Sequence, residues 1–486
     1  MRLSELFREV EFDGSIKNDA DINLVIDDSR LVRPGSLFVC IRHRSFDGHT
    51  AALDAFASGA AAVVTQDRLG LENELRVADS RSAYARLCAA LCNHPERKLR
   101  MIGVTGTNGK TTVTTLIRNI LSDSGTKTLL TGTVCNRLGD ENLPSGLTTP
   151  KPPELYSLLS RAVSQRCKAC VMEASSQALV QGRLEGIDFD AAVFTNITRD
   201  HLDYHGTFEN YISAKKKLFE YSALSIVNLD DPRANEIIAA SKGKIITFST
   251  VLDCADYTAK NISLLSDCVR FELVSKGHIE HIEFASPGLF SVSNAMAAAV
   301  CAVNLGIEPK DAAQSLAKSK SVCGRLERVE CSAPYSVIID YAHTPDGLEQ
   351  VLRALRPSCR GKLIVLFGCG GDRDRSKRPL MGAAACKYAD KIIVTSDNPR
   401  SEDPIKIIGD ILKGTDKKRR DLFVEPDRRK AIALALKTAE PGDTVLLAGK
   451  GHEKYQLIGG EKLPLDERET VRKILGLPHD TGRKKQ

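Results

Sequence analysis

A glycine-rich segment in the first third of the chain combines the residue types that bind phosphate. Residues 101–104 form an apolar run typical of a buried strand, and residues 106–112 read Gly-Thr-Asn-Gly-Lys-Thr-Thr before a helix predicted at 113–121. In a strand–turn–helix unit, backbone N–H groups and the helix N-terminus face a bound anion. Lys110 can reach a terminal phosphate there, and the Thr111 hydroxyl can bind magnesium. The spacing differs from G-x-x-x-x-G-K-[ST], so a glycine-rich turn without a ligand is the alternative interpretation.

Two more side chains suited to metal binding follow predicted strands downstream. Glu173 directly follows a strand predicted at 169–172, and His201 comes shortly after one predicted at 191–195. The carboxyl ends of parallel strands meet at one edge of a sheet, where α/β proteins bind ligands. With Thr111, these residues can hold magnesium at the γ-phosphate of a nucleotide. The alternative is that both are structural.

Charged residues at strand ends recur in the last third of the chain. Arg373, Arg400 and Glu453 each come soon after a predicted strand. A guanidinium binds a carboxylate through two parallel hydrogen bonds, and a glutamate can accept an ammonium. The three residues would therefore suit an amino acid with charges at both ends. A surface ion-pair network is an equally good interpretation of the spacing alone.

The elements that position these residues fall into three units. Residues 1–97 indicate a small α/β domain, and residues 98–328 repeat strands and helices around the glycine-rich segment, as a mainly parallel sheet requires. Residues 329–486 suggest a doubly wound, Rossmann-like domain. The predicted fold class is thus α/β with three domains. Further predicted strands are 22–26, 35–41, 60–64, 225–228, 336–339, 363–367, 391–395 and 444–448, and further predicted helices are 51–57 and 211–219.

The composition is that of a globular enzyme with several domains. The 486 residues are 42% hydrophobic and 27% charged, with a net charge of +6. That charge is mild, and its only basic block is the tail 483–485, so nucleic-acid binding is not expected. No apolar run is long enough to span a membrane, and the N-terminus lacks the apolar core of a secretory signal. We expect a cytoplasmic monomer.

The distribution of cysteines is also what we expect of a cytoplasmic protein. All 14 are scattered along the chain, many within apolar runs, as expected of small buried side chains in a reducing cytoplasm. Cys167 and Cys170 form the one close pair, and no second pair lies at zinc spacing. A metal or redox function of this pair is not expected.

Seven motifs, in this order along the chain, resemble those of the Mur ligases, which are ATP-dependent enzymes that form peptide bonds in peptidoglycan synthesis. The resemblance covers nearly the whole chain and implies a UDP-sugar-peptide domain, a central ATPase and a domain for the incoming amino acid. The version of the motif at 397–400 is the one associated in this family with meso-diaminopimelate rather than L-lysine. The motifs are Gly106–Thr112, Met172–Ser176, Thr195–Asp203, Tyr211–Phe219, Gly324–Glu327, Asp340–His343 and Gly449–Glu453.

The resemblance also implies roles for individual residues. Those expected at UDP-N-acetylmuramoyl-L-alanyl-D-glutamate are Ser29, His43, Arg44, Ser45, Thr148, Thr149, Ser175, Gln181 and Arg183. Those expected at ATP are Gly106, Thr107, Asn108, Gly109, Lys110, Thr111, Thr112, Asn228, Arg325 and Asp340. Those expected at magnesium are Thr111, Glu173, His201 and Lys215, of which Lys215 matches the family's carbamylated lysine. Those expected at meso-diaminopimelate are Arg373, Asp397, Asn398, Pro399, Arg400, Gly449 and Glu453.

The expected reaction is formation of an acyl phosphate from the D-glutamate γ-carboxylate and ATP, followed by attack of the diaminopimelate amine. Lys110, Lys215 and His201 are the expected catalytic residues, and either His201 or His343 could take the proton of the amine. The alternatives are the same ligation with L-lysine or another amino acid, and a sibling such as folylpolyglutamate synthetase or the ligase that adds D-alanyl-D-alanine. A nucleotide-binding switch without ligase activity is the alternative from another class.

Overall fold

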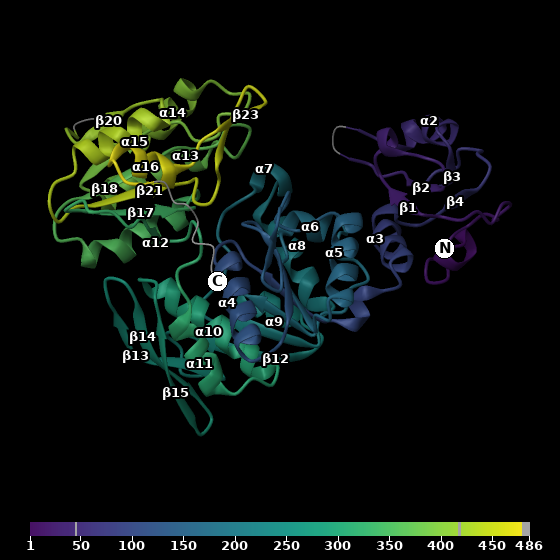
Figure 1. The fold of residues 1–486 in the computed structure, drawn as a ribbon, viewed down its shortest axis with the longest axis horizontal. Helices are drawn as coiled ribbons and strands as arrows, with labels where there is room; N and C mark the ends of the chain where they lie inside the picture. The colour runs from purple at the N-terminus through teal and green to yellow at the C-terminus, as the bar shows by residue number, and fades with distance from the viewer. Residues whose placement is uncertain (44–45, 417–418, 479–486) are drawn as a thin grey trace.

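The structure is a computed structural model, and it describes residues 1–43, 46–416 and 419–478. Figure 1 shows three bodies: an N-terminal sheet on the right, a large central sheet, and a C-terminal sheet at the upper left. The sheets contain four, eleven and six strands. This arrangement confirms the predicted fold class.

The N-terminal sheet is parallel throughout, in the order β1-β2-β3-β4. Alternate strand residues form two hydrophobic clusters, one with helices α1 (Leu3–Leu6) and α3 (Ser80–Leu91) and one with α2 (Ala52–Ala57). The strands predicted at 22–26, 35–41 and 60–64 are confirmed, mostly with shorter ends. The strands are β1 (Leu24–Ile26), β2 (Ser36–Val39), β3 (Ala60–Thr65) and β4 (Glu74–Arg76).

The middle of the central sheet is also parallel. Strand β5 (Arg100–Thr105) lies between β9 (Ala169–Glu173) and β10 (Ala191–Phe194), with their carboxyl ends side by side. Helices α4 (Lys110–Asp123) and α10 (Leu289–Asn304) bury apolar residues on one face of the sheet. Helices α5 (Pro152–Ser164) and α8 (Phe208–Glu220) cover the other face. The remaining parallel strands are β6 (Thr128–Thr131), β11 (Leu224–Asn228) and β12 (Lys244–Ser249).

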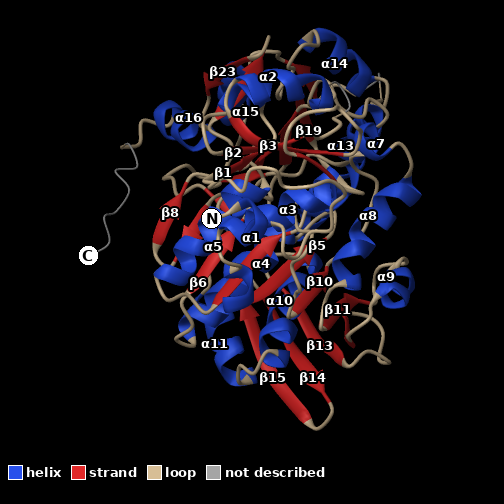
Figure 2. Cartoon of the chain, turned by 90° about the vertical axis from the view of Figure 1, so that its right-hand side faces the viewer, coloured by secondary structure: helices blue, strands red, loops and turns tan. Residues whose placement is uncertain are grey.

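Strands that pair with one another in antiparallel fashion extend the central sheet at both edges, and the sequence analysis did not predict them. The first of them at one edge joins β12 in parallel. One edge carries β13 (Tyr257–Leu264), β14 (Val269–Ser275) and β15 (His278–Phe284), and β14 and β15 reach the lower end of the molecule in Figure 2. The other edge carries β7 (Asn136–Leu138) and β8 (Glu141–Leu143). In β14, buried Val269, Phe271 and Leu273 alternate with more exposed residues, a period of two that could have identified the strand.

The C-terminal sheet has the order β16-β17-β21-β18-β19-β20, parallel except at β16. Helices α12 (Pro345–Leu355), α13 (Lys377–Tyr388) and α14 (Pro404–Leu412) pack on one face, and α15 (Arg428–Lys437) and α16 (Glu467–Ile474) on the other. Because β16 joins this sheet, we propose that the third domain begins before residue 329. The strands are β16 (Glu327–Arg328), β17 (Ser336–Asp340), β18 (Leu363–Phe367), β19 (Lys391–Val394), β20 (Leu422–Val424) and β21 (Thr444–Ala448).

The helices and the cysteines of residues 1–43, 46–416 and 419–478 bear on the compartment expected from the composition. In that part of the chain, no helix has the length and apolar character needed to cross a bilayer. All 14 cysteines are free thiols, and both Cys167 and Cys170 are buried.

Candidate active site

The glycine-rich segment forms a tight turn from β5 into α4. Gly106 has φ +152°, and a Cβ there would lie 1.9 Å from the Thr195 hydroxyl oxygen, so only glycine fits. The backbone N–H groups of Thr107 and Asn108 donate to Asn196, at 2.8 and 2.9 Å, and so hold the turn against the end of β10. Gly109 caps α4, whose first turn lines a large cavity. The predicted strand–turn–helix geometry is confirmed, and it suits a bound phosphate.

Lys110 begins α4, and its ammonium lies against the same turn. Nζ donates to the carbonyl oxygens of Gly106 and Thr107, at 2.8 and 2.9 Å. Burial lowers the pKa of Lys110, whereas the nearby carboxylates of Glu173 and Asp200 act in the opposite direction. A phosphate in the turn would give this buried ammonium an anionic partner.

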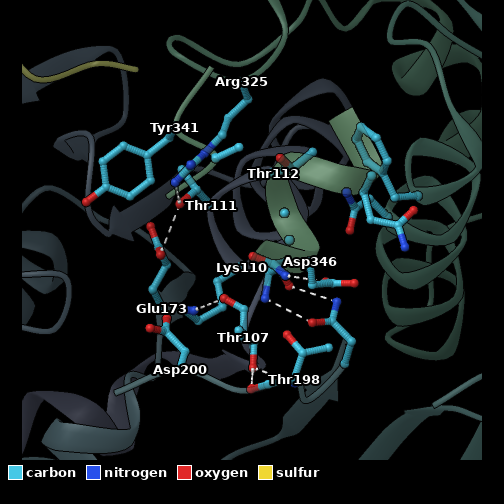
Figure 3. Close-up of a pocket in the computed structure, with 18 of the residues that line it drawn as sticks. Thr107, Lys110, Thr111, Thr112, Glu173, Thr198, Asp200, Arg325, Tyr341 and Asp346 are labelled. Carbon is cyan, nitrogen blue, oxygen red and sulfur yellow. Dashed lines mark hydrogen bonds between the residues drawn. The ribbon is translucent and has the colours of Figure 1, made fainter. Parts of the chain in front are cut away.

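Thr111 connects three segments that are distant in the sequence, as Figure 3 shows. Its hydroxyl donates to Glu173 Oε2 at 3.1 Å and accepts from Arg325 Nη2 at 3.1 Å. Thr133 orients the same carboxylate, because its backbone N–H donates to Oε1 at 2.8 Å and its hydroxyl to Oε2 at 3.0 Å. The guanidinium of Arg325 also lies 4.5 Å from the ring centroid of Tyr341. These contacts join the central and C-terminal sheets at the phosphate turn.

Lys215 is buried in the same region, although it comes from α8. Its side chain is only 1% exposed, and Nζ donates to the Gly106 carbonyl oxygen at 2.7 Å. Burial and the neighbouring Lys110 hold the pKa of Lys215 well below its usual value. A neutral amine, unlike an ammonium, can react with carbon dioxide, so this environment favours the carbamylated form expected from the family resemblance.

Asp200 lies between two histidines. Its Oδ2 is 3.4 Å from His201 Nε2 and 3.9 Å from His343 Nε2. Burial alone would raise the pKa of Asp200, but the two histidines and Lys377 outweigh it and lower the pKa to about 2. Burial lowers the pKa of His201 to about 4 and also lowers that of His343. Both imidazoles are therefore neutral near pH 7 and able to accept a proton.

A cavity of about 630 Å³ brings many of the predicted residues together. Asn108 and Asp346 are in contact in its wall, where Asn108 Nδ2 donates to Asp346 Oδ2 at 3.1 Å. Its lining includes the first turn of α4, the last residue of β9, the loop after β10, and the end of β17 (Figure 3). The predicted residues that line it are Thr107, Asn108, Gly109, Lys110, Thr111, Thr112, Thr148, Thr149, Glu173, Ser175, Arg183, His201, Lys215, Asn228, Arg325 and Asp340.

A smaller cavity of about 140 Å³ adjoins the large one, because Asp200, His201, Tyr341 and His343 line both. Its other walls are the loops after β18, β19 and β21. The predicted amino-acid-binding residues Arg373, Asp397, Asn398, Arg400, Gly449 and Glu453 all line it. Pro399, which lies between Asn398 and Arg400 in the sequence, does not line this cavity.

Arg400 is held in a defined orientation at this cavity. Its Nη1 donates to the Gly371 carbonyl oxygen at 2.7 Å, and its backbone has φ +55°. Burial and the neighbouring Arg373 lower the pKa of Arg400, so two partly desolvated cations face the cavity. Elsewhere in the lining, a Cβ on Gly449 would lie 2.7 Å from Asp397 Oδ2, and its φ is +106°, so glycine is required there. The arrangement suits a ligand with both a carboxylate and an ammonium.

Comparison with known proteins identifies the family. The Mur ligase middle domain matches residues 104–302, and the Mur ligase glutamate ligase domain matches residues 324–451. UDP-N-acetylmuramoyl-L-alanyl-D-glutamate–2,6-diaminopimelate ligase from Caldanaerobacter subterraneus subsp. tengcongensis is 43% identical over 479 residues, which are 98% of this chain and 99% of that protein. The chain belongs to the Mur ligase family.

Solved structures agree with this result. A structure of UDP-N-acetylmuramoyl-L-alanyl-D-glutamate–2,6-diaminopimelate ligase is 35% identical and superimposes with a TM-score of 0.70, covering 98% of this Mur ligase and 99% of that chain. MurF ligase from Thermotoga maritima in complex with ADP is 18% identical, with a TM-score of 0.61 and coverage of 93% and 96%. The second comparison shows the shared fold.

The residues expected at the UDP-peptide lie in two places in this Mur ligase. Four of them line the large cavity, where Arg183 Nη1 donates to the Thr149 carbonyl oxygen at 2.6 Å. Gln181 does not line either cavity, but it accepts a hydrogen bond from Arg183 Nη2 at 2.6 Å.

The other residues expected at the UDP-peptide are those assigned to its uridine end. Ser29 and His43 belong to the N-terminal domain and line neither cavity. His43 Nε2 lies 3.9 Å from Asp27 Oδ2, which also pairs with Lys151 of the central domain at 3.3 Å. Arg44 and Ser45 lie outside the described residues.

Two of the four residues expected at magnesium have the oxygen donors that this ion prefers. Thr111 and Glu173 place two hard oxygen atoms 3.1 Å apart beside the phosphate turn, which suits one magnesium ion completed by phosphate oxygens and water. Within the described residues, no group of three or more His, Cys, Asp or Glu side chains gathers as a metal cluster. His201 and Lys215 line the same cavity, where they contact Asp200 and Gly106 instead.

Several site residues were not predicted from the sequence. Asp200 lies inside a motif that was recognised, but its position between two histidines depends on β17 of the other sheet. Asp346 follows the motif at 340–343 and was missed because nothing in its local sequence indicates a ligand. Arg428 and Lys450 lie behind the smaller cavity and are fully buried. Because arginine and lysine are mostly exposed in proteins, nothing in the sequence predicts that these two are buried.

Proposed function

We propose that this Mur ligase uses ATP to join meso-diaminopimelate to the D-glutamate γ-carboxylate of UDP-N-acetylmuramoyl-L-alanyl-D-glutamate, in peptidoglycan synthesis. The observation that carries the proposal is the pair of adjoining cavities. The large one contains the phosphate turn, and the small one contains arginines and acids that suit an amino acid. Relatives 43% and 41% identical, from Caldanaerobacter subterraneus and Geobacillus kaustophilus, are named UDP-N-acetylmuramoyl-L-alanyl-D-glutamate–2,6-diaminopimelate ligase.

The first chemical step transfers a phosphoryl group. An oxygen of the γ-carboxylate attacks the γ-phosphorus of ATP, ADP leaves, and an acyl phosphate forms. The ammonium of Lys110 and the N–H groups of the first turn of α4 stabilise negative charge on the transferred group. Magnesium, bound by Thr111 and Glu173, would offset further charge on the phosphate oxygens.

The second step forms the amide bond. The neutral amine of diaminopimelate attacks the acyl carbon, and phosphate leaves with the electron pair of the broken C–O bond. His201 and His343 lie where the two cavities meet, and either neutral imidazole can take the proton that the amine loses. Enclosure of the site by two domains protects the acyl phosphate from water.

Three further expectations remain part of the proposal. Lys215 acts as a carbamate that supports magnesium, since its low pKa favours the neutral amine needed for carbamylation. Ser29 and His43 contact the uridine end of the peptide substrate. The enzyme works as a monomer in the cytoplasm.

Phosphate release with purified enzyme tests the proposal. Release from ATP should require both UDP-N-acetylmuramoyl-L-alanyl-D-glutamate and meso-diaminopimelate, and the product should gain the mass of one diaminopimelate minus water. L-Lysine, D-alanyl-D-alanine and folate substrates are the comparison compounds. Equal specificity constants for L-lysine and meso-diaminopimelate would refute the amino-acid assignment, and hydrolysis without either acceptor would favour a nucleotide switch.

A further inference from the structure

Lys450 lies directly behind the wall of the smaller cavity. It follows β21 and its side chain is fully buried, with 0% exposure, so it does not line the cavity itself. Its Nζ donates to Asn398 Oδ1 at 2.8 Å and to Glu453 Oε2 at 2.6 Å. Both of these partners line the cavity. A single buried ammonium therefore connects two of the side chains expected to contact the amino acid.

This contact sets the hydrogen-bonding character of Asn398. The amide oxygen accepts from Lys450 Nζ and, at 2.9 Å, from the backbone N–H of Leu457. Both partners can only donate, so the amide must present its oxygen to them, and both lone pairs are used. Its Nδ2 donates one hydrogen to Glu453 Oε2 at 2.9 Å. What Asn398 can offer the cavity is its second N–H group, a donor that suits a carboxylate.

The hydrogen bond from Lys450 also gives the two carboxylate oxygens of Glu453 different roles. Oε2 accepts from both Lys450 and Asn398, whereas Oε1 receives no hydrogen bond from a described residue. The carboxylate is thus fixed with one oxygen committed to the protein and the other available to a ligand. An ammonium is the ligand group that such an oxygen binds best.

We propose that Lys450 is a positioning residue of the amino-acid site, which makes Asn398 a donor to a substrate carboxylate and leaves one oxygen of Glu453 for a substrate ammonium. This inference rests on the proposed function and names the ligand class more closely: an α-amino-acid end that carries both groups. Without Lys450, the amide could turn over and present its oxygen, which repels a carboxylate. Glu453 would also lose its buried counter-charge and the contact that orients it.

Replacing the lysine by methionine tests this role, because methionine has a similar length and no charge. In Lys450→Met, the KM for meso-diaminopimelate should rise by about tenfold or more, while the KM values for ATP and the UDP-peptide stay within about twofold. Lys454→Met is the matched control, since Lys454 is four residues further along and its side chain is 74% exposed. Its three KM values should equal those of the wild type.

A second variant and a double variant keep the test decisive. If Lys450→Met does not fold, Lys450→Gln, which keeps donor groups, should show a smaller rise in the same KM. Combining a folded Lys450 variant with Asn398→Ala should produce less than the product of the two single effects, because Lys450 acts through Asn398. A folded variant with the wild-type KM for meso-diaminopimelate, or a parallel rise in all three KM values, would overturn the proposal. Wild-type enzyme that does not depend on meso-diaminopimelate would instead refute the proposed function.

Discussion

Arg400 allows the binding and the folding contributions of one residue to be separated. Its guanidinium faces the smaller cavity, and its backbone has φ +55°, a left-handed conformation that costs a residue with a Cβ about 1–2 kcal/mol. The backbone is held there by two hydrogen bonds to the hairpin of β22 (Tyr455–Ile458) and β23 (Glu461–Pro464): Arg400 N–H to the Leu457 carbonyl at 3.0 Å, and Gly459 N–H to the Arg400 carbonyl at 2.8 Å. We therefore expect this arginine to destabilise the fold while it strengthens substrate binding.

The expected loss of binding follows from the contacts of the guanidinium. One N–H of Nη1 is used by Gly371, which leaves the other N–H groups for a substrate carboxylate. Charge-assisted hydrogen bonds contribute about 1.5–3 kcal/mol each, and a partly exposed pair lies at the lower end, so two give roughly 3 kcal/mol. That energy corresponds to about a hundredfold in kcat/KM at about 1.4 kcal/mol per tenfold. Wild-type enzyme should prefer meso-diaminopimelate over L-lysine by the same factor, since L-lysine lacks the distal carboxylate.

Two substitutions at this position form the experiment. Arg400→Ala and Arg400→Gly should both lose about a hundredfold in kcat/KM for meso-diaminopimelate and lose the preference over L-lysine. The two variants should differ in stability. The free energy of unfolding in urea should be about 1 kcal/mol higher for Arg400→Gly than for Arg400→Ala, because glycine adopts positive φ without strain.

Arg166→Gly is the matched control. Arg166 is an exposed arginine after α5, with φ +61°. Replacing it with glycine should stabilise the fold by a similar free energy and leave the kinetic constants unchanged. An Arg400→Ala enzyme that remains selective for meso-diaminopimelate, or equal stability of the two Arg400 variants, would refute this reasoning.

Three further predictions concern the phosphate turn and its support. Lys110→Ala should reduce phosphate release by at least about a hundredfold with the fold intact, because an ammonium at the transferred group is lost, and a near wild-type rate would contradict this. Lys215→Ala should be nearly inactive, and added short-chain carboxylic acids should partly restore its activity. Wild-type activity should fall in buffer freed of carbon dioxide. If mass spectrometry finds an unmodified Lys215 in fully active enzyme, carbamylation is not required. Burial is the largest single influence on the pKa of Glu327 and raises it, but the contacts with Arg468 and the hydrogen bond from the Gly324 N–H together outweigh burial and lower the pKa. The folded pKa therefore lies below the unfolded value, and the pair with Arg468 stabilises the fold above the unfolded pKa. Glu327→Gln should therefore unfold more easily than wild type, by about 1–3 kcal/mol near pH 7, and this difference should disappear as the pH falls through the folded pKa; a pH-independent difference would exclude the ion pair as its cause.

Local patterns were sufficient for much of the fold. The strand before the phosphate turn, the helix after it, and the strands at 336–339, 363–367 and 444–448 were predictable because each is a short apolar run bounded by turn residues. The strands at the two edges of the central sheet were missed for a physical reason. The antiparallel strands at the edges of the central sheet have one face in solvent, so their apolar residues alternate and form no continuous run.

What the sequence determined by itself is therefore the local chemistry: the phosphate turn, the acids and bases at strand ends, and the family motifs that contain them. Only the tertiary structure decided which of these groups meet. The position of Asp200 between His201 and His343 requires strands from two different sheets, and the burial of Lys450 behind Asn398 and Glu453 requires the loops after β19 and β21 to converge. Hydrogen bonding and desolvation, which set donor roles and pKa values, depend on these long-range contacts and are not encoded in any single segment.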